Sequence, residues 1–159
     1  MRTPKVFPLV ALLISLTAFN TFGQKTKRIE IYKNGLYKDY IDVHYFYDDN
    51  NAVTAKQAVL YGQDLRYQGI SKSVIIFNGS LKELSKFLVD LETFLSENEE
   101  DVSNTIGGCR ITIAKQMGIK GVLVHEKDGL GYRGYNAKTL RKLKQSLSDW
   151  SEKNADSLE

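Results

Sequence analysis

The hydrophobic pattern of this chain is clearest over residues 73–98, where a short apolar run precedes a longer periodic one. Residues 74–77 are β-branched or aromatic, which is typical of a buried strand. After a polar break, leucines recur at steps of three and four residues and therefore line one face of a helix. These leucines are Leu81, Leu84, Leu88, Leu91 and Leu95. We expect the strand to lie inside a sheet, covered on both faces, and the helix to end near Ser96.

The C-terminal part of the chain repeats this arrangement in a shorter form. A strand predicted over residues 132–135 precedes a helix with apolar positions at the same steps: Leu140, Leu143, Leu147 and Trp150. Setting Leu81 against Leu140 superimposes the two apolar stripes. A duplicated β-then-α unit is therefore one alternative. The other is that two amphipathic helices resemble each other for physical reasons alone.

Strict alternation near the start of the domain predicts a two-stranded hairpin. Residues 27–33 place Ile29 and Ile31 on one face, and Asn34-Gly35 is typical of a two-residue turn, because both positions need positive φ. The returning strand, residues 36–47, presents its side chains on two faces. One face carries Ile41, Val43, Tyr45 and Tyr47, and the other carries Tyr40, Asp42, His44 and Phe46. A polar turn over residues 48–51 then closes the hairpin.

The remaining segments complete the predicted order of elements. Thr54, with Gln57 three residues later, has the form of a capping box, so residues 54–60 form either a short helix or a strand. Residues 106–115 and 119–126 alternate as strands around a turn at residues 116–118. The sequence thus predicts one α+β domain over residues 24–151, with a mostly antiparallel sheet and two main amphipathic helices on one face. We expect residues 152–159 to be a frayed polar tail.

The first 23 residues have the layout of a secretory signal peptide. Arg2 and Lys5 form a basic start, residues 6–19 are mostly apolar, and residues 21–23 offer small residues at a cleavage site. A permanent bilayer span needs about 20 apolar residues, so we expect no membrane span after cleavage. The chain is therefore predicted to be exported, to the periplasm or to the extracellular space.

The net charge and the cysteine content indicate which kind of partner and which cellular compartment to expect. Removal of Arg2 and Lys5 lowers the formal net charge from +3 to +1, and the remaining charges of both signs are interleaved. A nucleic-acid-binding sheet is an alternative that this charge and the export signal disfavour, and we expect no nucleic-acid partner. Cys109 is the one cysteine, so no intramolecular disulfide can form. A core without disulfides suits the bacterial envelope better than a eukaryotic secreted module.

Two patterns suggest chemistry, and each has a simpler structural explanation. Gly129, Gly131 and Gly134 fit the spacing of a dinucleotide-binding loop, but the helix starts only after Asn136, so hairpin turns explain the glycines and no cofactor is expected. Cys109 is a candidate nucleophile if His125 or His44 lies beside it, although a cysteine that opens an alternating strand is usually a small buried hydrophobe. A secreted hydrolase using Cys109 or a carboxylate pair is the enzymatic alternative. Two distant histidines give no metal site.

The tyrosine content favours a binding role. Nine tyrosines occur mainly in the predicted hairpins, and tyrosine on an exposed sheet face can stack on sugars or pack against peptides. The simpler explanation is that tyrosines suit strands. The candidate binding residues are Tyr40, Tyr45, Tyr47, Tyr132, Arg133 and Tyr135. The expected function is a non-catalytic binding or assembly component of the bacterial envelope, with a protein or glycan partner.

Overall fold

The computed structural model describes residues 25–34, 39–66, 73–127 and 130–154. The predicted signal peptide lies outside the described residues, as do residues 35–38 and the last five residues. Within the described ranges, no helix combines the length and the apolar character that a bilayer crossing requires.

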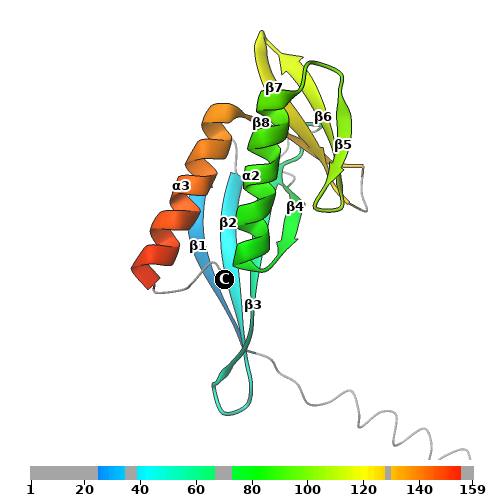
Figure 1. Cartoon of the computed structure of the whole chain (residues 1–159). Helices are drawn as coiled ribbons and strands as arrows, with labels where there is room; N and C mark the ends of the chain where they lie inside the picture. Colours follow the sequence, from blue (N-terminus) through cyan, green and yellow to red (C-terminus); the bar gives the residue numbers. More distant parts are fainter. Residues whose placement is uncertain (1–24, 35–38, 67–72, 128–129, 155–159) are drawn as a thin grey trace, which may run out of the picture.

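Two four-stranded antiparallel sheets and two helices make up the described fold (Figure 1). Sheet A contains β1 (Lys25–Asn34), β2 (Asp39–Tyr47), β3 (Val53–Gln63) and β4 (Ser73–Gly79), followed by α2 (Leu81–Glu97). Sheet B contains β5 (Ser103–Ile106), β6 (Cys109–Gln116), β7 (Ile119–His125) and β8 (Tyr132–Asn136), followed by α3 (Ala137–Asn154). The predicted α+β class is confirmed, with two sheets in place of one. Four strands followed by a helix occur twice.

The two helices lie side by side over one face of sheet A (Figure 1). In α2 the predicted leucine stripe is buried, together with Phe87 and Phe94. A capping box begins this helix, because the Ser80 hydroxyl accepts the Glu83 N–H and the Glu83 carboxylate accepts the Ser80 N–H at 2.7 Å. Asn136 caps α3 by accepting the Thr139 N–H at 2.9 Å. Superposing the two caps sets Leu84, and not Leu81, opposite Leu140.

The observed strands differ from the sequence prediction, or decide between its alternatives, at three places. The strand of residues 74–77 is β4, an edge strand of sheet A, and it alternates: Val74 is buried while Ile75 is 46% exposed. Because the helices cover sheet A on one face, an edge strand there needs only one apolar face. The helix alternative for residues 54–60 fails because these residues extend β3 in the ladder with β2. The short strand β5 is mostly polar and shows no apolar alternation, so the sequence pattern does not predict it.

The turns follow the prediction in two of three cases. Asn34 pairs with Asp39, so four residues join β1 to β2 and the two-residue turn at Asn34-Gly35 is wrong, although the hairpin itself is confirmed. The turn after β2 is present, and the Asp48 carboxylate accepts two backbone N–H groups there. The turn after β6 is also present, with positive φ at Met117 and Gly118. At the other end of the chain, α3 extends to Asn154.

A buried ion pair connects the two sheets. The Arg133 guanidinium on β8 donates to both oxygens of Asp39 on β2, at 2.7 and 2.6 Å. Both side chains are almost fully buried within one continuous apolar core that includes residues of both sheets and both helices. Gly62 on β3 makes room for the pair, because a Cβ there would lie 2.8 Å from Arg133 Cγ. Burial raises the pKa of the Asp39 carboxyl, and the Arg133 hydrogen bonds oppose that rise.

Breaking this ion pair should destabilise the fold strongly. We expect Arg133→Met to lower the free energy of unfolding by about 3–5 kcal/mol, because Asp39 is then buried without its charge partner. The double variant Asp39→Leu/Arg133→Met should recover most of that loss, since no buried charge is left behind. Urea denaturation followed by circular dichroism measures both effects. Equal losses in the single and double variants would contradict this account.

Candidate functional site

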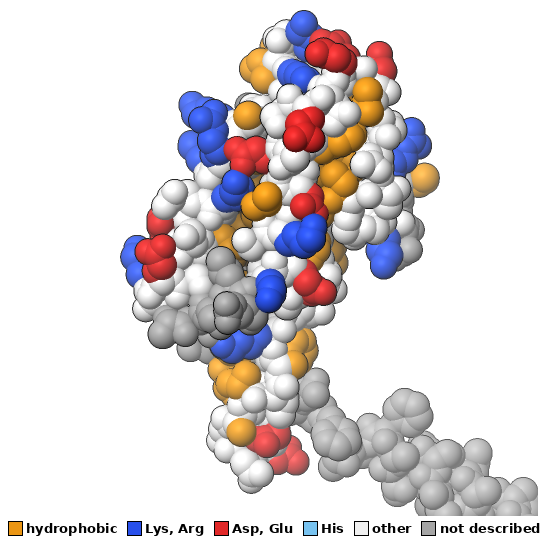
Figure 2. Space-filling model, in the orientation of Figure 1, with side chains coloured by type: hydrophobic (Ala, Val, Ile, Leu, Met, Phe, Trp, Pro, Cys, Tyr) orange, Lys and Arg blue, Asp and Glu red, His pale blue; other side chains and the backbone are white. Residues whose placement is uncertain are grey.

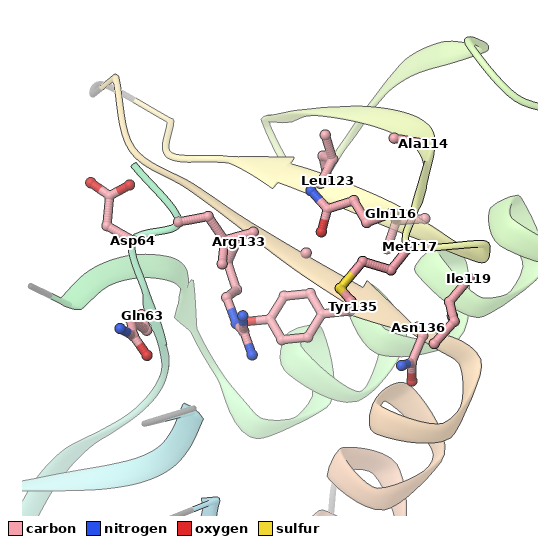
Figure 3. Close-up of a pocket in the computed structure, with 14 residues that line it drawn as sticks. Gln63, Asp64, Ala114, Gln116, Met117, Ile119, Leu123, Arg133, Tyr135 and Asn136 are labelled. Atoms are coloured by element: carbon pink, nitrogen blue, oxygen red, sulfur yellow. The ribbon is translucent and has the colours of Figure 1, made fainter. Parts of the chain in front are cut away.

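A groove of about 510 Å³ lies on the face of sheet B that points away from the core, and we call it the outer groove. Its floor is formed by four residues of β6, β7 and β8: Ala114, Gly121, Leu123 and Gly134. One wall comes from the loop after β3, which contributes Leu65, and the rim at the other end is the β6–β7 hairpin with Met117 and Ile119 (Figure 3). The lining is mixed: apolar side chains form the floor, the wall and the rim, and polar side chains stand among them. These polar residues are Gln63, Asp64, Gln116, Arg133 and Asn136.

Strand register explains why the floor is hollow. Val122 pairs with Tyr135 and both point into the core, so the neighbouring pair, Leu123 and Gly134, points outward. Packing requires Gly121, because a Cβ there would lie 2.9 Å from the Tyr135 carbonyl oxygen. At Gly134 a Cβ would meet only side-chain ends, those of Leu123 at 3.3 Å, Leu65 at 3.4 Å and Gln116 at 3.7 Å. The fold therefore does not require a glycine at position 134, whereas the hollow of the groove does depend on the missing side chain.

The wall of the outer groove is fixed by the loop that follows β3. The Leu65 N–H donates to the Tyr132 carbonyl at 3.0 Å, which continues strand pairing onto the edge of β8. Asp64 is fully buried. Its carboxylate accepts hydrogen bonds from two side-chain nitrogens of Arg66, Nε at 3.1 Å and Nη2 at 2.6 Å. These hydrogen bonds lower the pKa of Asp64. Asp64 therefore holds the loop as a carboxylate and is not poised as a general acid.

The rim of the outer groove carries two exposed apolar side chains. Met117 is fully exposed, and Ile119 is 58% exposed. Met117 also has a φ of 48°, a left-handed conformation for which asparagine or glycine is preferred in two-residue turns. Nothing in the fold explains a large apolar residue in this position. Conformational strain and exposure together make the hairpin tip a candidate contact site.

The predicted binding tyrosines do not form one surface. Tyr40 stacks on Tyr61, with ring centroids 4.7 Å apart, on the face of sheet A that points away from the helices. Tyr45 stacks on Tyr47, and Tyr45 packs against the core on the opposite face. Tyr132 lies beside His125 on sheet B. Arg133 and Tyr135 are only 6% and 1% exposed, but both are among the residues that line the outer groove. The two residues alternate along β8 with residues that point outward, and the sequence of the strand does not indicate which of its two faces the core covers.

The candidate nucleophile and histidines do not converge. Cys109 is buried, and its thiol donates to the Ile76 carbonyl at 3.3 Å. Val124 points into the core, so the next residue, His125, lies on the opposite face of sheet B from Cys109. His44 belongs to sheet A. Burial and the charge of Arg110 lower the pKa of His125, which favours the neutral form of its ring. The Cys109–His pairing is therefore not assembled.

Metal and nucleotide sites find no geometric support in the described chain. The described ranges contain no group of three or more His, Cys, Asp or Glu side chains able to hold a metal ion. Gly131 lies in the β7–β8 connection, where a Cβ would be 2.4 Å from Val74 Cγ1, and Gly134 lies inside β8. Close packing at Gly131 and the groove floor at Gly134 account for these two glycines, while Gly129 lies outside the described residues.

The comparisons with known proteins give no relative. No protein-family model matches the chain, and neither a curated protein nor a solved structure matches it significantly.

The Tyr135 hydroxyl is buried and has no hydrogen-bond partner among the described residues. Its ring points toward Arg133 (Figure 3), whose Cζ lies 5.6 Å from the ring centroid. Burial raises the pKa of Tyr135 well above its usual range. Because an unpaired buried hydroxyl is costly, we expect Tyr135→Phe to leave the free energy of unfolding unchanged or raise it by about 1–3 kcal/mol. A loss beyond about 1 kcal/mol in urea denaturation would show that the hydroxyl is paired.

The Asp64–Arg66 contact predicts a pH dependence of stability. The pKa of Asp64 in the folded chain lies below its ordinary value of 3.8, so its stabilising effect is complete above pH 3.8. This effect is lost as the pH falls through the folded-state pKa. Comparing wild type with Asp64→Asn by thermal denaturation across this range tests the sign. We expect wild type to be the more stable at pH 7 and the difference to shrink below pH 3.8.

Proposed function

We propose that this chain is an exported, non-catalytic binding or assembly component of the bacterial envelope. It binds a partner protein by taking an apolar side chain of that partner into the outer groove. The observation that carries the proposal is the fully exposed Met117, in a left-handed conformation, at the rim of a hollow whose floor is Gly134. An anchor side chain seated in an apolar pocket and ringed by further contacts is the common design of a protein–protein interface.

The lining of the groove favours a protein partner over a glycan. Sugar sites usually combine an exposed aromatic ring with several polar groups. The outer groove contains polar groups, such as Gln63 and Gln116, but its one aromatic ring, that of Tyr135, is turned into the core. Its floor and wall are formed by the apolar side chains of Leu65, Ala114 and Leu123. Glycine in a strand also lets another backbone or ring approach closely. These features suit an aliphatic or aromatic side chain of a polypeptide.

The hydrolase alternative has less support. Cys109 and His125 lie on opposite faces of sheet B, and Asp64 is held as a carboxylate by Arg66. Export rests on the layout of residues 1–23, which fits a signal peptide. The N-terminal sequence of the protein recovered from an envelope fraction tests that part directly, and a start near Gln24 is expected.

The binding proposal predicts which surface changes abolish capture. Mature wild-type protein is immobilised, exposed to an envelope extract, and its captured proteins are quantified by mass spectrometry. We expect Met117→Ser/Ile119→Ser, and separately Gly134→Leu, to reduce capture of the main partner by about tenfold or more. Leu130→Ser is the matched control, because Leu130 is 84% exposed but does not line the groove. Circular dichroism verifies that each variant is folded.

Three outcomes would contradict the proposal. The first is equal capture by wild type, the rim variant and the Gly134 variant. The second is loss of capture in Leu130→Ser alone. The third is a captured glycan whose binding survives all three changes.

A further inference from the structure

The second surface of interest is the outer edge of β4. This strand is last in the order of sheet A, so its backbone pairs with β3 on one side only. In the part of the chain that the structure describes, the one hydrogen bond recorded on its other side is the Cys109 thiol donating to the Ile76 carbonyl. A thiol is a weak donor, so a backbone N–H can replace it at little cost.

The composition of β4 lacks the usual protection of an edge strand. Natural edge strands carry lysine, proline or inward-pointing charges, which prevent another strand from adding to them. The seven residues of β4 contain no charge and no proline, and Ile75 is 46% exposed. A shift in register opposite Leu60 and Tyr61 is the one protective feature that the strand has. Such an edge invites strand addition.

A groove of about 490 Å³ runs beside this edge, and we call it the edge groove. Residues 75–78 of β4 form one wall, and the turn at Gly107 with Glu126 and Lys127 forms the other. Beyond Gly107, the furrow between α2 and the β5–β6 hairpin exposes apolar side chains (Figure 2), and hollows there are lined by Phe87 and Ile106. The apolar surface thus continues past the end of β4.

We propose that the edge groove binds one extended polypeptide segment, which pairs with β4 as a fifth strand of sheet A. Backbone donors and acceptors at strand spacing are matched by another extended backbone, and by no glycan or lipid surface. Residues on both sides line the same space of about 490 Å³, so the edge lies in a groove that suits one extended segment better than the folded sheet of a second copy. Glu126 and Lys127 present both signs of charge on that wall, which suits a segment of mixed charge.

This inference is independent of the outer groove, because the two sites share no lining residue. Random peptides of about 12 residues, long enough for a strand and its flanks, are displayed and selected on the mature wild-type chain. Enriched peptides are then labelled, and their affinity is measured by fluorescence anisotropy. Ile75→Lys places a charge on the exposed edge without disturbing the core. Val89→Lys is the matched control, since Val89 is 43% exposed on α2 and lies outside the edge groove.

We expect Ile75→Lys to lower the affinity for the selected peptides by about tenfold or more. Val89→Lys should leave that affinity within about twofold of the wild-type value. Amide hydrogen exchange across Ser73–Gly79 should slow when a peptide binds, as strand pairing protects backbone N–H groups. The variant Met117→Ser/Ile119→Ser should bind the same peptides with wild-type affinity. The experiment therefore distinguishes a wrong proposal for the edge groove from a wrong proposal for the outer groove.

Several results would overturn the inference. One is a selection that enriches no peptide for wild type over Ile75→Lys. Another is bound peptide that protects amides around Met117 in place of β4. A third is a wild-type dimer in sedimentation that Ile75→Lys converts to monomer, which would assign the edge to a second copy of the chain.

Discussion

The buried pair of Asp39 and Arg133 sets how the two sheets meet. Apolar side chains can slide past one another at little cost, whereas a two-point hydrogen-bonded ion pair holds only one alignment. Arg133 reaches sheet A because Gly62 leaves space beside it. The same alignment brings the end of β3 against β8, where the Leu65 N–H meets the Tyr132 carbonyl. The wall of the outer groove therefore depends on a contact made inside the core.

The two candidate binding surfaces arise for different physical reasons. The outer groove exists because Gly134 removes a side chain from a sheet face that the core leaves uncovered. The edge groove exists because β4 ends its sheet and sheet B stops short of covering residues 75–78. The outward side chains of the grooves, such as Leu123 and Ile75, lie outside the apolar core, although Val122 and Tyr135 in the outer groove and Ile76 and Cys109 in the edge groove belong to it. Binding at these surfaces therefore need not compete with folding.

The doubled order of four strands and a helix also has a structural logic. Each sheet has one apolar face, and neither helix is wide enough to cover a four-stranded sheet alone. Placing α2 and α3 side by side, joined at the surface by the Lys144–Glu92 ion pair, covers both units at once. The cap of Ser80 with Glu83 and the cap of Asn136 with Thr139 start the helices at equivalent points. The helix alignment read from leucines alone was three residues away from this register.

Elements with local signals follow from the amino-acid sequence alone. The stripe from Leu81 to Leu95, the turn at Met117-Gly118 and the alternation of Ile111 and Ile113 follow from periodicity and turn chemistry. Other features depend on which faces and edges of the sheets are covered by segments distant in the chain. β4 looked like an interior strand because its position at the edge is set by sheet order, which no local pattern records. Arg133 and Tyr135 looked exposed because a partner 94 residues away in the chain, Asp39, and the space at Gly62 are needed to bury them.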